Sequence, residues 1–205
     1  MGVREDRRGG DLVDKLTPVI VDHLETRLGP LRSGWTRDPS GVELPFQVAE
    51  FGGGGQLVGS TSYATIGVSR HSLPSPAGQQ GISLELVMTT HSALAPSRFP
   101  QALQLVAGEL LARHVPILRG QTFALPWSVA EGSKMAVLYA AAPGYFDEGF
   151  DSVELEDGCG VAIVWMVPIS VAEAEFVSSE GWDAFERLLV SADPDLLDPG
   201  RPSIV

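Results

Sequence analysis

One segment near the C-terminus constrains the fold more than any other. Residues 161–167 are seven apolar residues in a row, and Pro168 follows them. An uninterrupted apolar run rich in β-branched residues is typical of a strand covered on both faces, and a proline ends a strand because it has no N–H for the ladder. Ser170 and Glu173 then fit the Ser-x-x-Glu capping box of a helix start. The segment predicts a buried strand that ends at Pro168 and leads into a helix.

The remaining pattern predicts an α+β fold with a mixed, largely antiparallel sheet packed with helices. Apolar residues recur at helical spacing in 11–28, between Pro96 and Pro116, and after Ser170, where Gly181 leaves either two short helices or one broken helix. The first helix has an alternative start at Pro18. Strands are predicted at 44–51, 62–68, 82–88, 121–125 and 135–142, and in a hairpin over 153–167 with its turn at Asp157-Gly158.

Three parts of the chain differ in composition. Residues 1–10 are polar and glycine-containing and are predicted to be a flexible leader, whereas 11–192 are predicted to be a single domain. Residues 193–205 contain three prolines and are predicted to be an extended tail. This tail either lies on the domain or remains free.

The charge balance restricts the partners that the chain can bind. Its 205 residues include 26 acidic and 14 basic side chains, which gives a formal net charge of −12. Binding to nucleic acid or to an anionic membrane needs clustered Lys and Arg, so we expect neither as a partner. A basic protein partner is compatible with this charge, and so is a merely well-solvated acidic surface.

The cysteine count, the N-terminal residues and the lengths of the apolar runs predict a cytoplasmic location. Cys159 is the single cysteine, so no disulfide forms within the chain. The N-terminal residues lack the pattern of a signal peptide, and no apolar run approaches the ~18 residues of a membrane span.

No constellation of residues predicts catalysis, a metal site or a cofactor. No two of the four histidines have the spacing of metal ligands on one helix, and no cysteine pair joins them. The glycine run 52–55 lacks the Lys-Ser/Thr that follows a phosphate-binding loop, so it is interpreted as a connection between strands. An enzyme remains an alternative only if its site is assembled from distant residues at strand ends, such as His91, Ser69 and Glu85.

A dense group of carboxylates is the best candidate for a binding surface. We name residues 147–157 the acidic segment. It is either a solvated edge that discourages aggregation or a docking face for a basic partner. His91 after a strand and Trp127 in a loop are further candidates, although Trp127 is also consistent with a core or tail-packing residue. A structural subunit of a larger assembly is the other alternative. The candidate carboxylates are Asp147, Glu148, Asp151, Glu154, Glu156 and Asp157.

Four stretches of the chain carry short motifs in a fixed order. The first, 63–69, carries Thr-x-Gly-x-Ser, and the second, 82–88, carries a central Glu-Leu. The third is the strand–proline–helix segment 164–170 with Glu173 and Glu175, and the fourth is the tail stretch 198–203. Together these stretches resemble the Suppressor of fused domain family in its bacterial single-domain form.

The resemblance implies an α+β fold and a non-enzymatic protein-binding module. Bacterial single-domain members resemble immunity proteins of polymorphic toxin systems. The resemblance therefore implies an immunity or regulatory protein that captures a partner protein, such as a basic toxin domain. It assigns no binding residue to this sequence.

Overall fold

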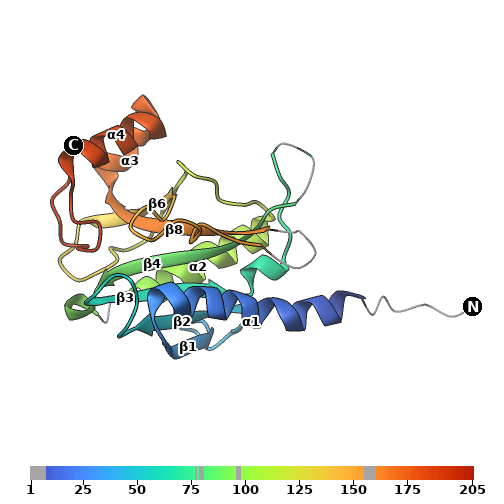
Figure 1. The fold of residues 1–205 in the computed structure, drawn as a ribbon. Coiled ribbons are helices and arrows are strands. Elements are labelled where there is room, and N and C mark those ends of the chain that lie inside the picture. Colours follow the sequence, from blue (N-terminus) through green and yellow to red (C-terminus); the bar gives the residue numbers. More distant parts are fainter. Residues whose placement is uncertain (1–7, 77, 79–80, 96–97, 155–159) are drawn as a thin grey trace, which may run out of the picture.

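The computed structural model describes residues 8–76, 78, 81–95, 98–154 and 160–205, with side chains from Thr17 onward. Its strands form one sheet in the order β1-β2-β3-β4-β8-β6-β5, with β7 beside β8 (Figure 1). Among the described pairs only β4 and β8 run parallel, which confirms the predicted mixed, largely antiparallel sheet. The strands are β1 Leu31–Arg37, β2 Glu43–Gly52, β3 Ser60–Ile66, β4 Ser83–His91, β5 Thr122–Ala124, β6 Met135–Ala141, β7 Ser152–Glu154 and β8 Gly160–Ser170.

The predicted apolar strand is β8, which pairs with β4 on one edge and with β7 and β6 on the other. The prediction that Pro168 ends this strand is wrong, because β8 continues to Ser170. Pairing with β4 stops at Trp165, whereas pairing with β6 continues to Ser170. The proline therefore lies where one edge of the strand no longer pairs, and a missing N–H is tolerated there.

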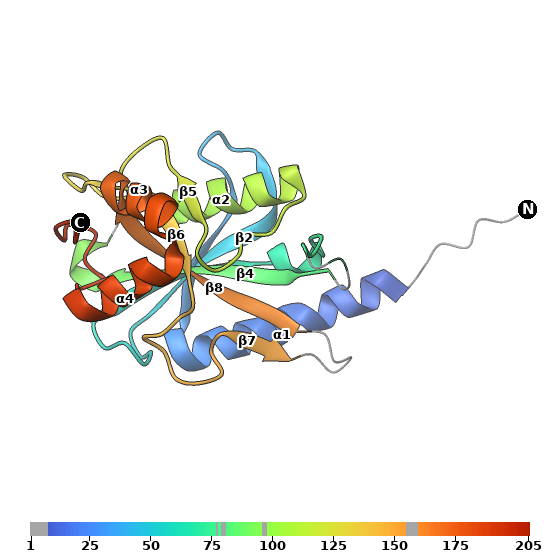
Figure 2. The same cartoon turned by 90° about the horizontal axis from the view of Figure 1, so that it is seen from above.

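Helices cover both faces of the sheet. Figure 2 shows α1 and α2 on opposite sides of β4 and β8. Met166 of β8 belongs to the apolar cluster beneath α2, whereas its neighbours Trp165 and Val167 belong to a cluster beneath α3 and α4. Side chains alternate between the two faces of a strand, so α3 and α4 share the face that α1 covers. The helices are α1 Arg8–Leu28, α2 Phe99–Arg113, α3 Val171–Glu180 and α4 Trp182–Ala192.

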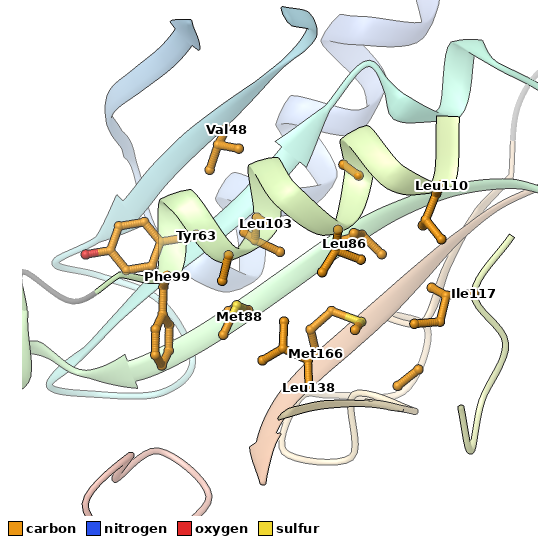
Figure 3. Close-up of a cluster of buried hydrophobic side chains, with 14 of the residues drawn as sticks. Val48, Tyr63, Leu86, Met88, Phe99, Leu103, Leu110, Ile117, Leu138 and Met166 are labelled. Carbon is orange, nitrogen blue, oxygen red and sulfur yellow. The ribbon is translucent and has the colours of Figure 1, made fainter. Parts of the chain in front are cut away.

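The largest apolar cluster fills the space between α2 and the sheet. In Figure 3, Phe99 and Leu103 of α2 lie against Leu86 and Met88 of β4, and Met166 of β8 lies beside them. All five side chains are at most 1% exposed. Burial of this area is the main stabilising contribution on the α2 face.

The first helix, the edge strand β1 and the β7–β8 turn differ most from the sequence prediction. Helix α1 begins at Arg8, inside the predicted leader, and runs through Pro18, so the alternative start at Pro18 is wrong. Strand β1 was not predicted because it is an edge strand whose residues are mostly exposed and lack apolar alternation. The β7–β8 hairpin is confirmed, but Glu154 pairs with Gly160, one residue away from the register of a two-residue turn at Asp157-Gly158. That turn, like residues 1–7 of the leader, lies outside the described residues.

The C-terminal tail lies on the domain. The carbonyl of Leu197 accepts hydrogen bonds from Thr90 Oγ1 (2.9 Å) and from the amide of His91 (3.3 Å). Leu197 and Ile204 pack on the cluster beneath α3 and α4. Val205 is 46% exposed, so only part of the tail end is covered.

A buried ion pair fastens this tail to the helix start. Arg201 and Glu173 side chains are 3% and 0% exposed, and the guanidinium donates to Oε1 at 2.6 Å and to Oε2 at 3.1 Å. Glu173 is also the capping-box residue of α3: its Oε2 accepts from the amide of Ser170, and its own amide donates to Ser170 Oγ. The amide of Ile204 donates to Oε1 as well. One carboxylate therefore caps a helix and holds the tail.

We expect Arg201→Met to lower the free energy of unfolding by about 3–5 kcal/mol, because it leaves the Glu173 carboxylate buried without its cation. Urea denaturation followed by circular dichroism measures this loss. Arg187→Met is the matched control, since it breaks the exposed pair with Asp183 and should change stability by less than about 1 kcal/mol. Equal effects of the two variants would contradict the proposed weight of the buried pair.

Candidate functional site

Four of the predicted carboxylates lie in residues 147–154, the described part of the acidic segment, which we call the strip. Asp147, Glu148, Asp151 and Glu154 are all exposed. Within the described part of the chain, none of the four forms an ion pair. Glu156 and Asp157 lie outside the described residues. The four carboxylates are therefore not neutralised by any cation among the described residues.

Aromatic side chains anchor the inner side of this strip. Phe150 is fully buried, and its ring centroid lies 4.4 Å from that of Phe146. Tyr145 contacts Trp165 of β8 with ring centroids 4.9 Å apart, and its hydroxyl donates to the carbonyl of Pro194 at 3.3 Å. Aromatic burial of this kind fixes the backbone that presents the carboxylates.

The glycine run supports the same strip. Gly55 passes so close to the end of α1 that a Cβ there would lie 2.5 Å from the carbonyl carbon of Leu28. This close approach positions Gln56, whose amide donates to the carbonyl of Arg27 at 2.7 Å. The Gln56 side chain then donates to Asp147 Oδ2 at 2.6 Å and accepts from the amide of Asp147 at 3.1 Å. Glycine at position 55 thus serves a close backbone contact.

The two other predicted binding residues occupy different places. His91 ends β4, and its Nε2 lies 2.7 Å from Asp195 Oδ2 in the tail. Pro194, next to Asp195 in the tail, accepts a hydrogen bond from Tyr145, two residues before the acidic segment. The tail therefore connects His91 to the start of this segment. Trp127 is partly buried against the cluster beneath α2, on the opposite face of the sheet, and Arg98 stacks on its ring at 5.7 Å. The structure therefore does not bring Trp127 together with the acidic segment.

Glu85 is a second buried carboxylate, and it organises the β3–β4 region. Its two oxygens accept from Thr65 Oγ1 (2.6 Å), from the amide of Gly67 (2.8 Å), and from the amide (3.1 Å) and hydroxyl (2.6 Å) of Ser69. Gly67 has φ +107°, a conformation that glycine adopts without strain and that turns the chain so that these groups converge. Burial raises the pKa of Glu85, while these hydrogen bonds oppose that rise.

An enzyme site assembled from Ser69, Glu85 and His91 would need these side chains to lie together and to be open to a substrate. Ser69 and Glu85 are hydrogen-bonded, but their exposed fractions are 4% and 0%, so no substrate reaches them in this structure. His91 lies six residues further along β4, which at ~3.3 Å per residue is about 20 Å from Glu85. The three residues named for an assembled catalytic site therefore do not meet.

The sequence pattern did not predict that Glu85 and Glu173 are buried centres of hydrogen bonding, although the motifs named in the sequence contain both residues. Thr65, Gly67 and Ser69 belong to one of the four stretches singled out in the sequence, and Glu85 belongs to the next. Glu173 and Arg201 come from the other two. A glutamate inside an apolar strand was the available signal, since a buried charge requires partners. The four stretches thus supply the hydrogen-bond partners of two buried carboxylates, which is a structural role.

The described residues were also compared with the patterns of a metal site and of a membrane-spanning helix. In the described residues, no group of three or more His, Cys, Asp or Glu side chains is arranged to hold a metal ion. The described helices include none that is long and apolar enough to cross a membrane.

We expect Glu85→Leu to destabilise the protein by about 2–6 kcal/mol, because it leaves the two buried amides of Gly67 and Ser69 without an acceptor at ~1–3 kcal/mol each. Glu85→Gln keeps one acceptor oxygen and should cost less than Glu85→Leu. Chemical denaturation measures both variants. The matched control is Glu43→Leu at an exposed position, where only an exposed ion pair with Arg37 is lost and we expect a change of less than about 1 kcal/mol. A neutral Glu85→Leu variant would refute the organising role of this carboxylate.

The fold of this chain is similar to that of several solved structures. Solved structures with the same fold include a Suppressor of fused homologue from Neisseria gonorrhoeae, with TM-score 0.72 and 20% identity, covering 94% of this chain and 98% of that one. The Sufu–Fu complex matches with TM-score 0.63 and 15% identity, covering 92% of each chain. Drosophila Suppressor of Fused matches with TM-score 0.56 and 16% identity, covering 78% of this chain and 43% of that protein. Among curated proteins, none matches the sequence.

The family-level match rests on the sequence itself. Residues 43–202 match the family described as Suppressor of fused protein (SUFU). This range includes both buried carboxylates, the acidic segment and most of the tail. The chain therefore belongs to the Suppressor of fused protein family, a family of protein-interaction modules.

Proposed function

We propose that this chain is a non-enzymatic immunity or regulatory protein that captures a basic partner protein, such as a toxin domain, through its acidic segment. The observation that carries the proposal is the exposed strip of carboxylates held on an aromatic base. Asp147, Glu148 and Asp151 face solvent, while Phe150 behind them is fully buried.

Electrostatics support a basic partner. The chain has a formal net charge of −12, so it attracts cationic proteins over a distance limited by salt screening. Complementary charge at an interface raises the association rate and suppresses binding of acidic competitors. The acidic segment adds a local concentration of charge to this overall field.

The fixed conformation of the strip, residues 147–154, supports specific capture. A flexible acidic loop loses conformational entropy when it binds, whereas a loop held in its bound shape loses less. The bonds from Gln56 to Asp147 and from Tyr145 to Pro194 hold this strip from two sides. Such a strip favours recognition of a defined arrangement of Lys and Arg over unspecific attraction.

The fold is compatible with partner capture. A related structure of the same fold is the Sufu–Fu complex, in which the homologue is bound to another protein. That relative covers 92% of this chain at 15% identity, so it carries the fold and leaves the binding residues of this chain to experiment.

The test is capture of partners from native cell lysate by three tagged proteins. The wild type is compared with the triple variant Glu148→Gln, Asp151→Asn and Glu154→Gln. A matched control removes three exposed carboxylates outside the segment, at Glu131, Glu175 and Glu180. We expect wild type and control to retain a basic protein at low salt and the triple variant to lose it. With the purified partner, the association rate constant of the triple variant should fall at least about tenfold.

A growth assay tests the immunity role separately. Expression of the captured protein alone should arrest growth, and co-expression of wild type should restore it, whereas the triple variant should not. A captured protein that is harmless when expressed alone would point to the regulatory role. Equal loss of capture in the triple variant and the control would mean that overall charge, and not the acidic segment, binds the partner.

A further inference from the structure

The loop between β6 and β7 forms a small cavity beside the strip, which we name the Phe146 cavity. Its volume is about 210 Å³. Sites that hold a whole drug-sized ligand have volumes of about 300–1,000 Å³, so this cavity matches one side chain of a partner better than a separate small molecule. The lining combines apolar side chains with carboxylates of the strip: Ala142, Pro143, Phe146, Asp147, Glu148 and Asp151.

The aromatic ring in this lining is fixed from behind. Phe146 is half-buried, and its ring centroid lies 4.4 Å from that of Phe150 and 6.4 Å from that of Trp165 in β8. Phe150 and Trp165 are 0% and 3% exposed. Because these buried rings hold Phe146 in place, a side chain that enters the cavity meets a ring that does not have to be ordered on binding.

The carboxylates in the lining are suited to a cation. The side chain of Gln56 donates to Asp147 Oδ2 at 2.6 Å and so orients this carboxylate. Glu148 and Asp151 are exposed, and no cation among the described residues pairs with any of the three. A long basic side chain can place its methylene groups on an apolar surface while its charged end stays near water and carboxylates. Both Arg and Lys have this form.

An arginine of the chain itself shows how an aromatic ring and a carboxylate act together. Cζ of Arg119 lies 5.1 Å from the centre of the Trp182 ring, and Nε donates to Glu186 Oε1 at 2.9 Å. Nη2 of the same guanidinium donates to Oε2. A planar guanidinium can stack with its face and donate with its edge at once, whereas an ammonium has no flat face and is more strongly hydrated. The Phe146 cavity combines the same two kinds of group.

We propose that the Phe146 cavity binds one arginine side chain of the basic partner, with the methylene groups on Phe146 and the guanidinium at Glu148 and Asp151. This inference rests on the proposed function, because it names the group that the strip recognises. It goes beyond attraction between opposite charges, since it predicts that guanidinium is preferred over ammonium.

Nuclear magnetic resonance titration of the isolated protein tests the cavity without any partner. The probe is Nα-acetylarginine amide, and the corresponding lysine and citrulline compounds are compared with it at constant ionic strength. The arginine compound should shift the resonances of Gly144, Phe146 and Gly149, which line the cavity, and the shifts should saturate. The lysine compound should bind more weakly. Citrulline has nearly the same shape without the charge and should not bind.

Three variants locate the binding. Glu148→Gln removes a carboxylate from the lining and should weaken binding of the arginine compound by about two- to fivefold. Glu154→Gln is the matched control, because this carboxylate lies in the same strip but not in the lining, so affinity should stay the same. Phe146→Leu keeps an apolar side chain without the ring and should weaken binding by about two- to fivefold. Since Glu148 is exposed, its variant tests the cavity even if Phe146→Leu does not fold.

Several results would overturn the arginine site. These are shifts that do not saturate, equal binding of the arginine compound and either of the other two, or equal weakening by Glu148→Gln and Glu154→Gln. Failure of the site and failure of the proposed function are distinguishable. Capture of a basic protein by a chain that does not bind the arginine compound would refute the site alone. Binding of the arginine compound without capture of any basic protein would support the site and contradict the proposed function.

Discussion

Buried carboxylates are the interaction on which the rest of this structure depends. A charge removed from water is stable only when donors replace its hydration. Glu85 obtains them from Thr65 and from the turn at Gly67 and Ser69, which fixes the end of β3 against β4. Glu173 obtains them from the start of α3 and from Arg201. Each carboxylate thus imposes a specific geometry on segments that apolar packing alone would leave free to shift.

The pair of Glu173 and Arg201 also contributes to holding the acidic segment. The tail that Arg201 fastens carries Pro194, whose carbonyl accepts from Tyr145, two residues before the strip. From the other side, α1 contributes His23 beneath Phe150, and the glycine run contributes Gln56 beside Asp147. The strip is therefore supported by three segments that are remote in sequence. Among the described carboxylates of the strip, Asp147 accepts a hydrogen bond from Gln56, and none of them forms an ion pair.

The surface and the interior use acidic residues in opposite ways. The interior glutamates Glu85 and Glu173 are buried and hydrogen-bonded within the fold, so they are poor candidates for chemistry despite the raised pKa of Glu85. Exposed carboxylates on the acidic segment have no ion-pair partner among the described residues, so their charge is directed outward. Membership of the Suppressor of fused protein family agrees with this division, because a binding module needs a rigid interior and a distinctive surface.

The sequence by itself determined the class of the fold and most elements, because apolar periodicity and capping chemistry are local. The capping box at Ser170 and Glu173 and the apolar run of β8 are examples. It did not reveal the exposed edge strand β1, and it misjudged Pro168, whose tolerance depends on where β4 stops pairing. Only the tertiary structure decided that Arg201 is buried on Glu173 and that His23 contacts Phe150. Contacts across 28 and 127 positions leave no local pattern, because they arise from how the elements pack.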